Sequence, residues 1–141
     1  MDSRIHSDVV VIGGVAAGTK AAATLARRRP DWRITVFERG DRVSYSTCGL
    51  PYYASGEIQD ISALTGTSWG GERSPEFFAR YRGVEVITRA EVVAVNRKRK
   101  SVTVRLLSSG EEYEHGYDKL ILATGAVPAI PRFPCDHSEI I

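Results

Sequence analysis

The sequence contains very little cysteine. Only Cys48 and Cys135 occur in 141 residues, too few for the disulfide framework of a small secreted scaffold, although a bridge between the two is possible. In a reducing compartment a cysteine in an unusual setting is more often reactive than structural. Cys135 lies in a proline-containing tail, and we interpret it as incidental.

Long apolar runs and a strong charge of either sign are also missing. No stretch approaches the ~20 apolar residues that span a bilayer, and the first eight residues, MDSRIHSD, lack the apolar core of a signal peptide. We therefore expect a cytoplasmic protein with no membrane partner. A net charge of +2 is too small to indicate a nucleic-acid partner. His6, His115 and His137 have no metal-ligand spacing, so no metal site is expected.

The beginning of the chain has the pattern of one βαβ unit. Residues 8–12 form a short apolar run that ends at glycine, which is typical of a buried parallel strand entering a turn. Residues 16–29 are rich in alanine and favour a helix, and residues 33–37 read as a second strand closed by Glu38. The expected fold class is therefore α/β, with a parallel sheet and helices.

Further along, the periodicity changes from helical to alternating. Ser74 and Pro75 are a good helix start, and the helix is expected to reach Tyr81. Three strands follow that we group as a small β-meander over residues 84–107. Their expected ranges are 84–88, 91–96 and 102–107. Residues 119–123 form another apolar strand, whereas the pattern in residues 58–73 predicts no clear element.

A glycine-rich segment between the first strand and the first helix carries the first chemical signal. It reads Gly13-Gly14-Val15-Ala16-Ala17-Gly18. The first glycine permits a tight turn, the last permits close packing of helix on strand, and the helix N-terminus attracts a pyrophosphate. Glu38 follows 20 residues after the last glycine, where an acid holds ribose hydroxyls. The middle glycine of the fingerprint is Val15, and a tight turn without a ligand is the alternative interpretation.

The second signal is the segment Ser44-Tyr45-Ser46-Thr47-Cys48-Gly49-Leu50-Pro51-Tyr52-Tyr53. A cysteine followed by Gly-Leu-Pro fits the start of a short helix near residue 49 better than a regular strand. A helix N-terminus favours the thiolate, which is the reactive form. The alternative, a buried cysteine acting as a small hydrophobe, disagrees with the polar residues before it.

These two segments, together with Ala123-Thr124-Gly125-Ala126-Val127-Pro128, resemble the pyridine nucleotide-disulfide oxidoreductases. The similarity is greatest to the single-cysteine branch, which contains coenzyme A-disulfide reductases, persulfide reductases, NADH oxidases and NADH peroxidases. The resemblance implies a Rossmann-like FAD-binding domain, with NADH or NADPH as electron donor bound outside this chain. It also implies that the flavin reduces a redox-active cysteine, which is Cys48 here.

The resemblance assigns further roles by position. The backbone of Ala90-Glu91-Val92 matches the stretch that holds the adenine. Arg27 and Ser44 match substrate positions, with Arg27 facing a coenzyme A phosphate, although arginines at residues 27–29 also complement the dipole of a helix C-terminus. The expected cofactor-binding residues are Gly13, Gly14, Val15, Ala16, Ala17, Gly18, Glu38, Arg39, Thr47, Cys48, Glu91, Val92, Ala123, Thr124 and Gly125.

Three differences sort the chain within the family. Tyr52 and Tyr53 stand where a second cysteine of a C-x-x-x-x-C pair would be, which excludes a local redox disulfide. Ala16 replaces the glycine-loop histidine of the peroxidase and oxidase members. Ala17 and Thr47 replace residues that are usual in reductases of coenzyme A disulfide and persulfide, Gly and Asn respectively.

The interpretation is an NAD(P)H-dependent reductase of a disulfide, persulfide or polysulfide, with coenzyme A derivatives as possible substrates. An NADH oxidase or peroxidase that cycles Cys48 through sulfenic acid, and a non-catalytic nucleotide-binding module, are the alternatives. We expect residues 1–131 to be the N-terminal segment of the FAD-binding domain. Residues 132–141, with Pro134 between Pro131 and the end, read as an exit linker toward an NAD(P)H domain of a longer homodimer. The chain alone is expected to be inactive.

Overall fold

The computed structural model describes residues 5–67, 70–127 and 129. Its strands are β1 (Ile5–Ile12), β2 (Ile34–Phe37), β3 (Glu85–Ile87), β4 (Ala90–Asn96), β5 (Ser101–Leu106) and β6 (Glu112–Leu122). Its helices are α1 (Ala16–Arg28), the single 3-10 turn η1 (Thr47–Gly49), α2 (Leu50–Ala54), α3 (Ser62–Thr65) and α4 (Pro75–Arg82). The proposed linker at residues 132–141 lies outside the described residues, as do Pro128, Pro131, Cys135 and His137.

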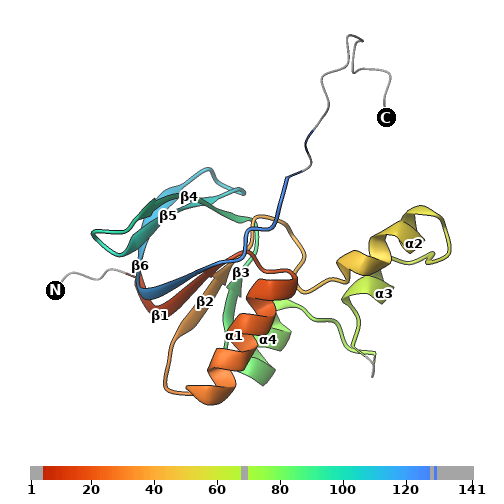
Figure 1. Ribbon diagram of the computed structural model, residues 1–141, viewed down its shortest axis with the longest axis horizontal. Helices are drawn as coiled ribbons and strands as arrows, with labels where there is room; N and C mark the ends of the chain where they lie inside the picture. Colours follow the sequence, from red (N-terminus) through yellow and green to blue (C-terminus); the bar gives the residue numbers. More distant parts are fainter. Residues whose placement is uncertain (1–4, 68–69, 128, 130–141) are drawn as a thin grey trace, which may run out of the picture.

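The strands form one six-stranded sheet in the order β3-β2-β1-β6-β5-β4 (Figure 1). Strands β3, β2, β1 and the second half of β6 run parallel, whereas β4, β5 and the first half of β6 form an antiparallel meander. The two parts meet at His115, which pairs with Val102 of β5 on one side and with Ile5 of β1 on the other. The α/β class with a small β-meander, expected from the sequence, is therefore confirmed.

Strand β1 is the centre of the core because both of its faces are buried. Val9 and Val11 point to the face that α1 and α4 cover, where Ala22 and Phe78 pack against them. The opposite face, which includes Val10, is covered by residues of β4 and β5. A strand buried on both sides reads as a continuous apolar run, which explains why the sequence pattern identified it.

The ends of α4 match the sequence prediction. The side chain of Ser74 accepts a hydrogen bond from the backbone N–H of Phe77 at 3.3 Å, and Pro75 occupies the first turn. The helix ends at Gly83, whose φ of 61° is in the left-handed region.

Two predicted strands need correction. Residues 84–88 were assigned to the meander, but β3 pairs in parallel with β2, in register Val36 to Val86. Alternation is the same in either arrangement, so the pattern cannot identify the partner strand. The strand predicted at 119–123 is the second half of β6, which begins at Glu112. Its first half is polar and does not read as a buried strand.

Helices α2 and α3 lie to one side of the sheet and its covering helices (Figure 1). Within residues 58–73, for which the sequence predicted no clear element, the chain forms α3 and an isolated antiparallel bridge between Gly66 and Glu72. In the part of the chain that the structure describes, no helix has the length and apolarity needed to cross a membrane.

A buried chain of polar side chains lies at the end of the sheet where β1 begins. The hydroxyl of Thr35 donates to the Glu85 carboxylate at 2.8 Å, the Ser7 and Thr35 hydroxyls are 2.7 Å apart, and Nε2 of His115 is 2.9 Å from Ser7. A carboxylate only accepts hydrogen bonds, so Thr35 donates to Glu85 and Ser7 donates to Thr35. Ser7 then accepts from His115, whose neutral ring therefore carries its proton on Nε2. The opposite nitrogen, Nδ1, is buried and has no hydrogen-bond partner in the described structure.

Protonation of His115 would add a proton to Nδ1 and so create a buried N–H donor that has no acceptor. The side chain is 1% exposed, and burial lowers the pKa of His115, with the charge of Glu85 opposing the effect only in part. The unfolded chain therefore takes up a proton at higher pH than the folded one. The stability that neutral His115 provides is present above its unfolded pKa of about 6.5 and is lost as pH falls from there through the lowered folded pKa.

We expect acidification below pH 6.5 to lower the free energy of unfolding, with a slope of at most about 1.4 kcal/mol per pH unit from this single proton. His115→Gln keeps a donor toward Ser7 but does not titrate, so its unfolding midpoint should depend less on pH. Urea unfolding of the chain between pH 7.5 and 5 measures the difference. The unfolding midpoints at pH 7.5, where His115 is neutral in both the folded and the unfolded chain, are the control and measure the effect of the substitution itself. Equal slopes in His115→Gln and the wild type would assign the acid sensitivity to other groups.

Candidate functional site

The carboxyl ends of three parallel strands bring the predicted site segments together. Gly13 follows β1, Glu38 follows β2 and Ala123 follows β6. The N–H of Gly13 donates to the carbonyl of Phe37, and that of Ala123 donates to the carbonyl of Ile12, each at 2.8 Å. In open α/β sheets, ligands bind in the crevice at this edge.

The glycine-rich turn is possible only without side chains at two positions. Gly13 has a φ of 103°, and a Cβ there would overlap the carbonyl oxygen of Ala123. A Cβ on Gly18 would overlap the carbonyl oxygen of Gly13. By contrast, Val15 has a negative φ of −95°, so the position of the missing middle glycine does not need the left-handed backbone that favours glycine.

The N-terminus of α1 faces outward from this turn with open backbone groups. Ala16 and Ala17 are exposed, and the described residues provide neither a side-chain cap nor an acidic residue in the first turn. The unpaired N–H groups of such a helix start, with the helix dipole behind them, form a site for an anion.

Glu38 is held against the glycine turn by its own carboxylate. One oxygen accepts the N–H of Gly14 at 2.6 Å and the other accepts the N–H of Gly40 at 2.8 Å. The backbone carbonyl of Glu38 also accepts the N–H of Ala90 at 3.0 Å. The acid predicted from the spacing after Gly18 is therefore beside the turn, with carboxylate lone pairs that these bonds do not use.

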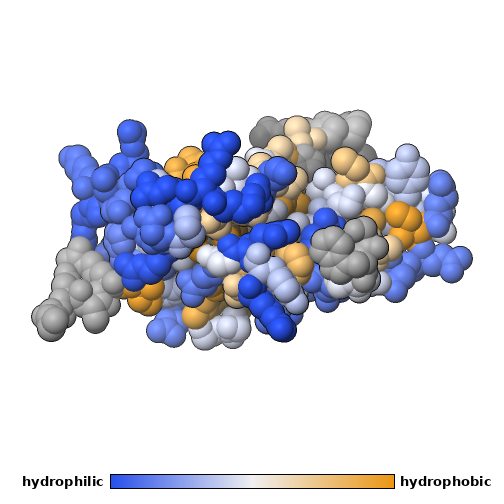
Figure 2. Space-filling model, turned by 90° about the horizontal axis from the view of Figure 1, so that it is seen from below, coloured by the Kyte–Doolittle hydropathy of each residue, from blue (hydrophilic) through white to orange (hydrophobic). Residues whose placement is uncertain are grey.

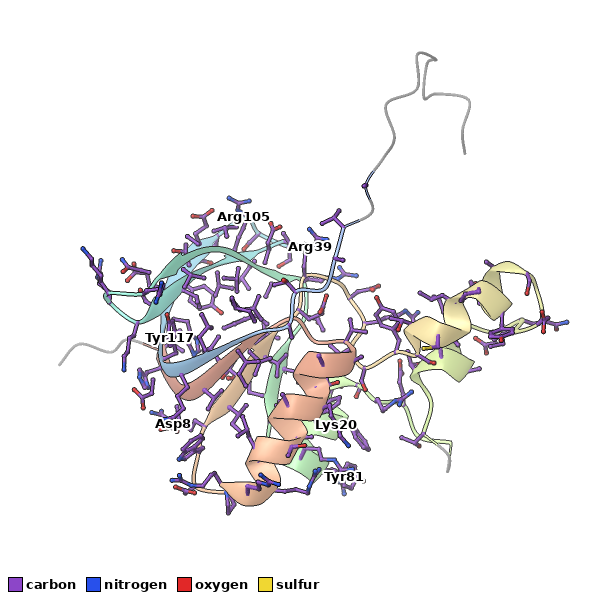
Figure 3. All side chains as sticks on the ribbon, viewed as in Figure 1. Asp8, Lys20, Arg39, Tyr81, Arg105 and Tyr117 are labelled. Carbon is purple, nitrogen blue, oxygen red and sulfur yellow. The ribbon has the colours of Figure 1, made fainter. Side chains whose placement is uncertain are left out.

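The start of β4 lies next to the end of β2 and is lined by charged side chains. Glu91 is 3.7 Å from Arg39 through one oxygen and 3.7 Å from Arg105 through the other. Arg39 and Arg105 project on the same side of the molecule, above the meander (Figure 3). Because both arginine side chains are accessible to solvent, these pairs contribute little to the stability of the fold. The arrangement places Glu91, with Val92 after it, at the same edge as Glu38.

The cysteine segment is attached to the glycine turn by its backbone. The N–H of Ser44 donates to the carbonyl of Gly14 at 2.8 Å, and Ser44 has a left-handed φ of 52°. Cys48 lies in η1, directly before α2, and its side chain is exposed. Thr47 precedes it in the same turn and is also exposed. The helix start near residue 49 expected from the sequence is present.

Thr124 and Gly125 complete the sheet edge on the β6 side. Both are exposed, and Gly125 has a φ of 72°. Their position beside Gly13 follows from the contact between Gly13 and Ala123.

A basic cleft of about 400 Å³ lies between α1, the cysteine segment and α4. Both residues that the resemblance assigned to substrate, Arg27 and Ser44, line it. Its lining also contains three cations that the sequence reasoning missed: Lys20, Arg73 and Arg82. Cys48 is not among the described residues that line it, although Tyr45 and Ser46 of the same segment are. Figure 2 views the molecule from below, and hydrophilic and hydrophobic residues are mixed over the middle of this face.

One of the missed cations has a visible signal in the sequence. Ala16, Lys20, Ala23 and Arg27 are spaced by four, three and four residues, which places them on one face of α1, and all of them line the cleft. Arg73 and Arg82 come from a separate part of the chain, and no local pattern connects them to this face. Among the described residues, no group of three His, Cys, Asp or Glu side chains is arranged to hold a metal ion.

Comparison with known proteins gives close relatives. The chain is 36% identical over 132 residues to a coenzyme A disulfide reductase of Staphylococcus haemolyticus, covering 92% of this chain and 28% of that protein. It is 37% identical over 124 residues to a CoA-dependent NAD(P)H sulfur oxidoreductase of Pyrococcus furiosus, covering 88% and 26%. The chain thus spans about a quarter of the length of these relatives.

Solved structures agree. A NAD-dependent persulfide reductase from A. fulgidus matches 96% of the chain, and 24% of its own, with 40% identity and a TM-score of 0.86. A water-forming NADH oxidase from Lactobacillus brevis matches 92% of the chain, and 27% of its own, with 32% identity and a TM-score of 0.78. The model of one protein family covers residues 7–140. The chain therefore belongs to the pyridine nucleotide-disulphide oxidoreductase family.

Proposed function

We propose that the protein is an FAD-dependent enzyme that uses NAD(P)H to reduce a disulfide, persulfide or polysulfide, with Cys48 as its nucleophile. The observation that carries the proposal is the hydrogen bond from the Ser44 N–H to the Gly14 carbonyl. It attaches the segment of an exposed cysteine to the turn that is shaped for a dinucleotide. A nucleotide-binding module without catalysis has no need of a reactive cysteine there.

The residues of the sheet edge fit FAD. Gly13 and Gly18 leave the backbone without side chains where a pyrophosphate approaches, and the open N–H groups of α1 supply donors for it. Glu38 supplies acceptors for ribose hydroxyls. The backbone of Glu91 and Val92 is available to the adenine, and Ala123, Thr124 and Gly125 border the same edge. We assign these residues, with Arg39 and Thr47, to the cofactor.

The chemistry of this chain is that of Cys48. Its thiolate attacks one sulfur of the substrate, a Cys48–substrate disulfide forms, and the other sulfur leaves as a thiolate or as sulfide. FAD, when bound, would supply the two electrons, taken from NAD(P)H, for this mixed disulfide. Cys48 then returns to the thiolate, and the substrate half leaves as a second thiolate. Tyr52 and Tyr53 provide no second thiol nearby, so the electrons have to reach Cys48 from the cofactor.

The basic cleft supports a polyanionic substrate. Lys20, Arg27 and Arg82 supply positive charge to it, and Ser44 adds a hydroxyl. A coenzyme A derivative carries phosphates at one end and sulfur at the other, so the phosphates fit the cations while the sulfur extends toward the cysteine segment. Relatives named as coenzyme A-dependent support this substrate class.

A second candidate has support from relatives named NADH oxidase, which are 32% identical in Methanocaldococcus jannaschii and 33% identical in Enterococcus faecalis. In that reaction Cys48 cycles through sulfenic acid. Ala16 stands against it, because oxidase and peroxidase members resemble one another in having histidine there. Steady-state assays of the intact protein with coenzyme A disulfide, sulfane sulfur, peroxide and oxygen separate the two functions.

The proposal extends to a cytoplasmic homodimer, as the resemblance to the family implies. Light scattering of the intact protein in solution measures its oligomeric state.

We expect Glu38→Ala to weaken FAD binding in the intact protein by about tenfold, because it removes the acceptor for the ribose and releases the N–H groups of Gly14 and Gly40. Flavin fluorescence titration measures the Kd. Glu111→Ala, at an exposed residue between β5 and β6, is the control and should bind FAD as the wild type does. Equal Kd values in the two variants would remove Glu38 from the FAD site.

We expect the 141-residue chain alone to retain FAD weakly and to show no turnover. The edge that would receive the flavin is open on the side of Thr124 and Gly125, both of which are exposed. Gel filtration after incubation with FAD, followed by an absorbance spectrum of the protein peak, tests this. A stoichiometric yellow complex would show that the described edge encloses the cofactor by itself.

We expect Cys48→Ser in the intact protein to abolish thiol release while flavin reduction by NADH continues. Hydride transfer to the flavin does not involve the sulfur, whereas attack on the substrate needs a thiolate, and a serine hydroxyl is far too weakly acidic to replace it. Stopped-flow flavin bleaching and steady-state thiol release report the two halves separately. Cys135→Ser is the matched control and should keep nearly full activity. Thiol release near the wild-type rate in Cys48→Ser would refute the single-cysteine mechanism.

A further inference from the structure

The segment between α3 and α4 turns back so that Arg73 lies at the C-terminal end of α3. Thr67 closes the turn, since its N–H donates to the Gly71 carbonyl at 2.6 Å and its hydroxyl accepts the Gly71 N–H at 2.9 Å. An antiparallel bridge between Gly66 and Glu72 adds to the closure. The residue that follows this bridge is Arg73.

Arg73 pairs the last carbonyls of α3. Its Nη2 donates to the carbonyl of Leu64 and its Nε donates to that of Thr65, each at 3.1 Å, while its backbone N–H donates to Thr65 at 3.0 Å. The last carbonyls of a helix have no partner within the helix. Leu64 and Thr65 are buried, with 3% and 2% exposure, so their carbonyls are paired by donors of the protein rather than by solvent.

Leu64 in turn holds both sides of the cysteine. Its carbonyl, the one that Arg73 contacts, accepts the N–H of Ser46 at 2.9 Å. Its side chain fills the space that a Cβ on Gly49 would need. Gly49 also donates to the carbonyl of Ser46 at 3.1 Å. Ser46 and Gly49 flank Cys48, so the position of the cysteine depends on Leu64.

We propose that Arg73 is a positioning residue for Cys48, acting through Leu64. The proposal rests on the function assigned to Cys48 above. Arg73 lines the basic cleft with Arg82, but the two differ in their contacts. Arg82 makes its side-chain hydrogen bond to Tyr81 of its own helix, at 3.4 Å, whereas the guanidinium of Arg73 spans two carbonyls that support the cysteine segment. Arg82 therefore supplies positive charge for substrate binding in the cleft, whereas Arg73 keeps the Cys48 sulfur in position.

The experiment compares Arg73→Met with Arg82→Met in the intact, FAD-loaded protein, using coenzyme A disulfide as substrate. Arg73→Met should lower kcat for thiol release by about tenfold or more, because a small displacement of the reacting sulfur is costly, and KM should change by less than about twofold. Arg82→Met should raise KM and leave kcat within about twofold. Arg73→Lys, which keeps one donor, should recover part of the kcat.

Hydrogen–deuterium exchange gives a readout that needs no substrate. The backbone amides of residues 44–49 should exchange faster in Arg73→Met and at the wild-type rate in Arg82→Met, while α1 keeps its protection in both. Flavin reduction by NADH should be unchanged in Arg73→Met, which shows that the variant is folded.

Three results would overturn the proposal. In the first, Arg73→Met behaves like Arg82→Met and changes KM alone, which makes Arg73 a substrate cation. In the second, exchange of residues 44–49 is unchanged. In the third, flavin reduction is lost together with thiol release, which gives Arg73 a role in the whole fold. A failure of the proposed function gives a different result. In that case Cys48→Ser still releases thiol, and this outcome does not depend on the exchange rates measured in Arg73→Met.

Discussion

The other parts of the site depend on one constraint, which is the close approach of the Gly13 backbone to the backbones of Ala123 and Gly18. A Cβ at Gly13 would overlap the carbonyl of Ala123, and a Cβ at Gly18 would overlap the carbonyl of Gly13, so a side chain at either position would separate β1 from β6 or from α1. The next residue, Gly14, contacts both chemical parts of the site. Its N–H binds the Glu38 carboxylate and its carbonyl binds the Ser44 N–H. Displacement of this turn would therefore move Glu38 at the sheet edge and the cysteine segment together.

Strand β6 explains how the meander reaches the same edge. Its first half pairs with β5 and its second half with β1, and His115 takes part in both pairings. This shared strand lets β4 and β5 cover the face of β1 that the helices leave open. The start of β4 then lies against Glu38 through the hydrogen bond from Ala90. The polar chain of Ser7, Thr35 and His115 lies at the other end of the sheet, so protonation of His115 affects the stability of the fold and not the chemistry proposed for Cys48.

The sequence predicted the parts of the molecule whose cause is local. Burial on both faces makes β1 a continuous apolar run, and Ser74 and Pro75 form a helix start that needs no distant partner. Features that depend on distant pairing were wrong or missed. Strand β3 alternates as a meander strand would, yet it pairs with β2. The first half of β6 reads as polar because only alternate residues, including His115 and Tyr117, are buried. In the cleft, the face of α1 with Lys20 and Arg27 follows from helical spacing, whereas Arg73 reaches the site only because the turn at Thr67 brings it back.

The two halves of the site differ in what holds them, and this bears on how the family varies. Around Gly13 the contacts are made by backbone atoms and by the absence of side chains, so many sequences satisfy them. This agrees with a TM-score of 0.86 at only 40% identity for the persulfide reductase from A. fulgidus. The basic cleft is different, because the charge that faces it comes from Lys20 and Arg27 of α1 and from Arg82 of α4. Substitutions there change what enters the cleft without disturbing the turn beneath it. Because the turn and the cleft are held by different atoms, one fold can carry different clefts. This is consistent with relatives that share the fold but are named for disulfide, persulfide or oxygen chemistry.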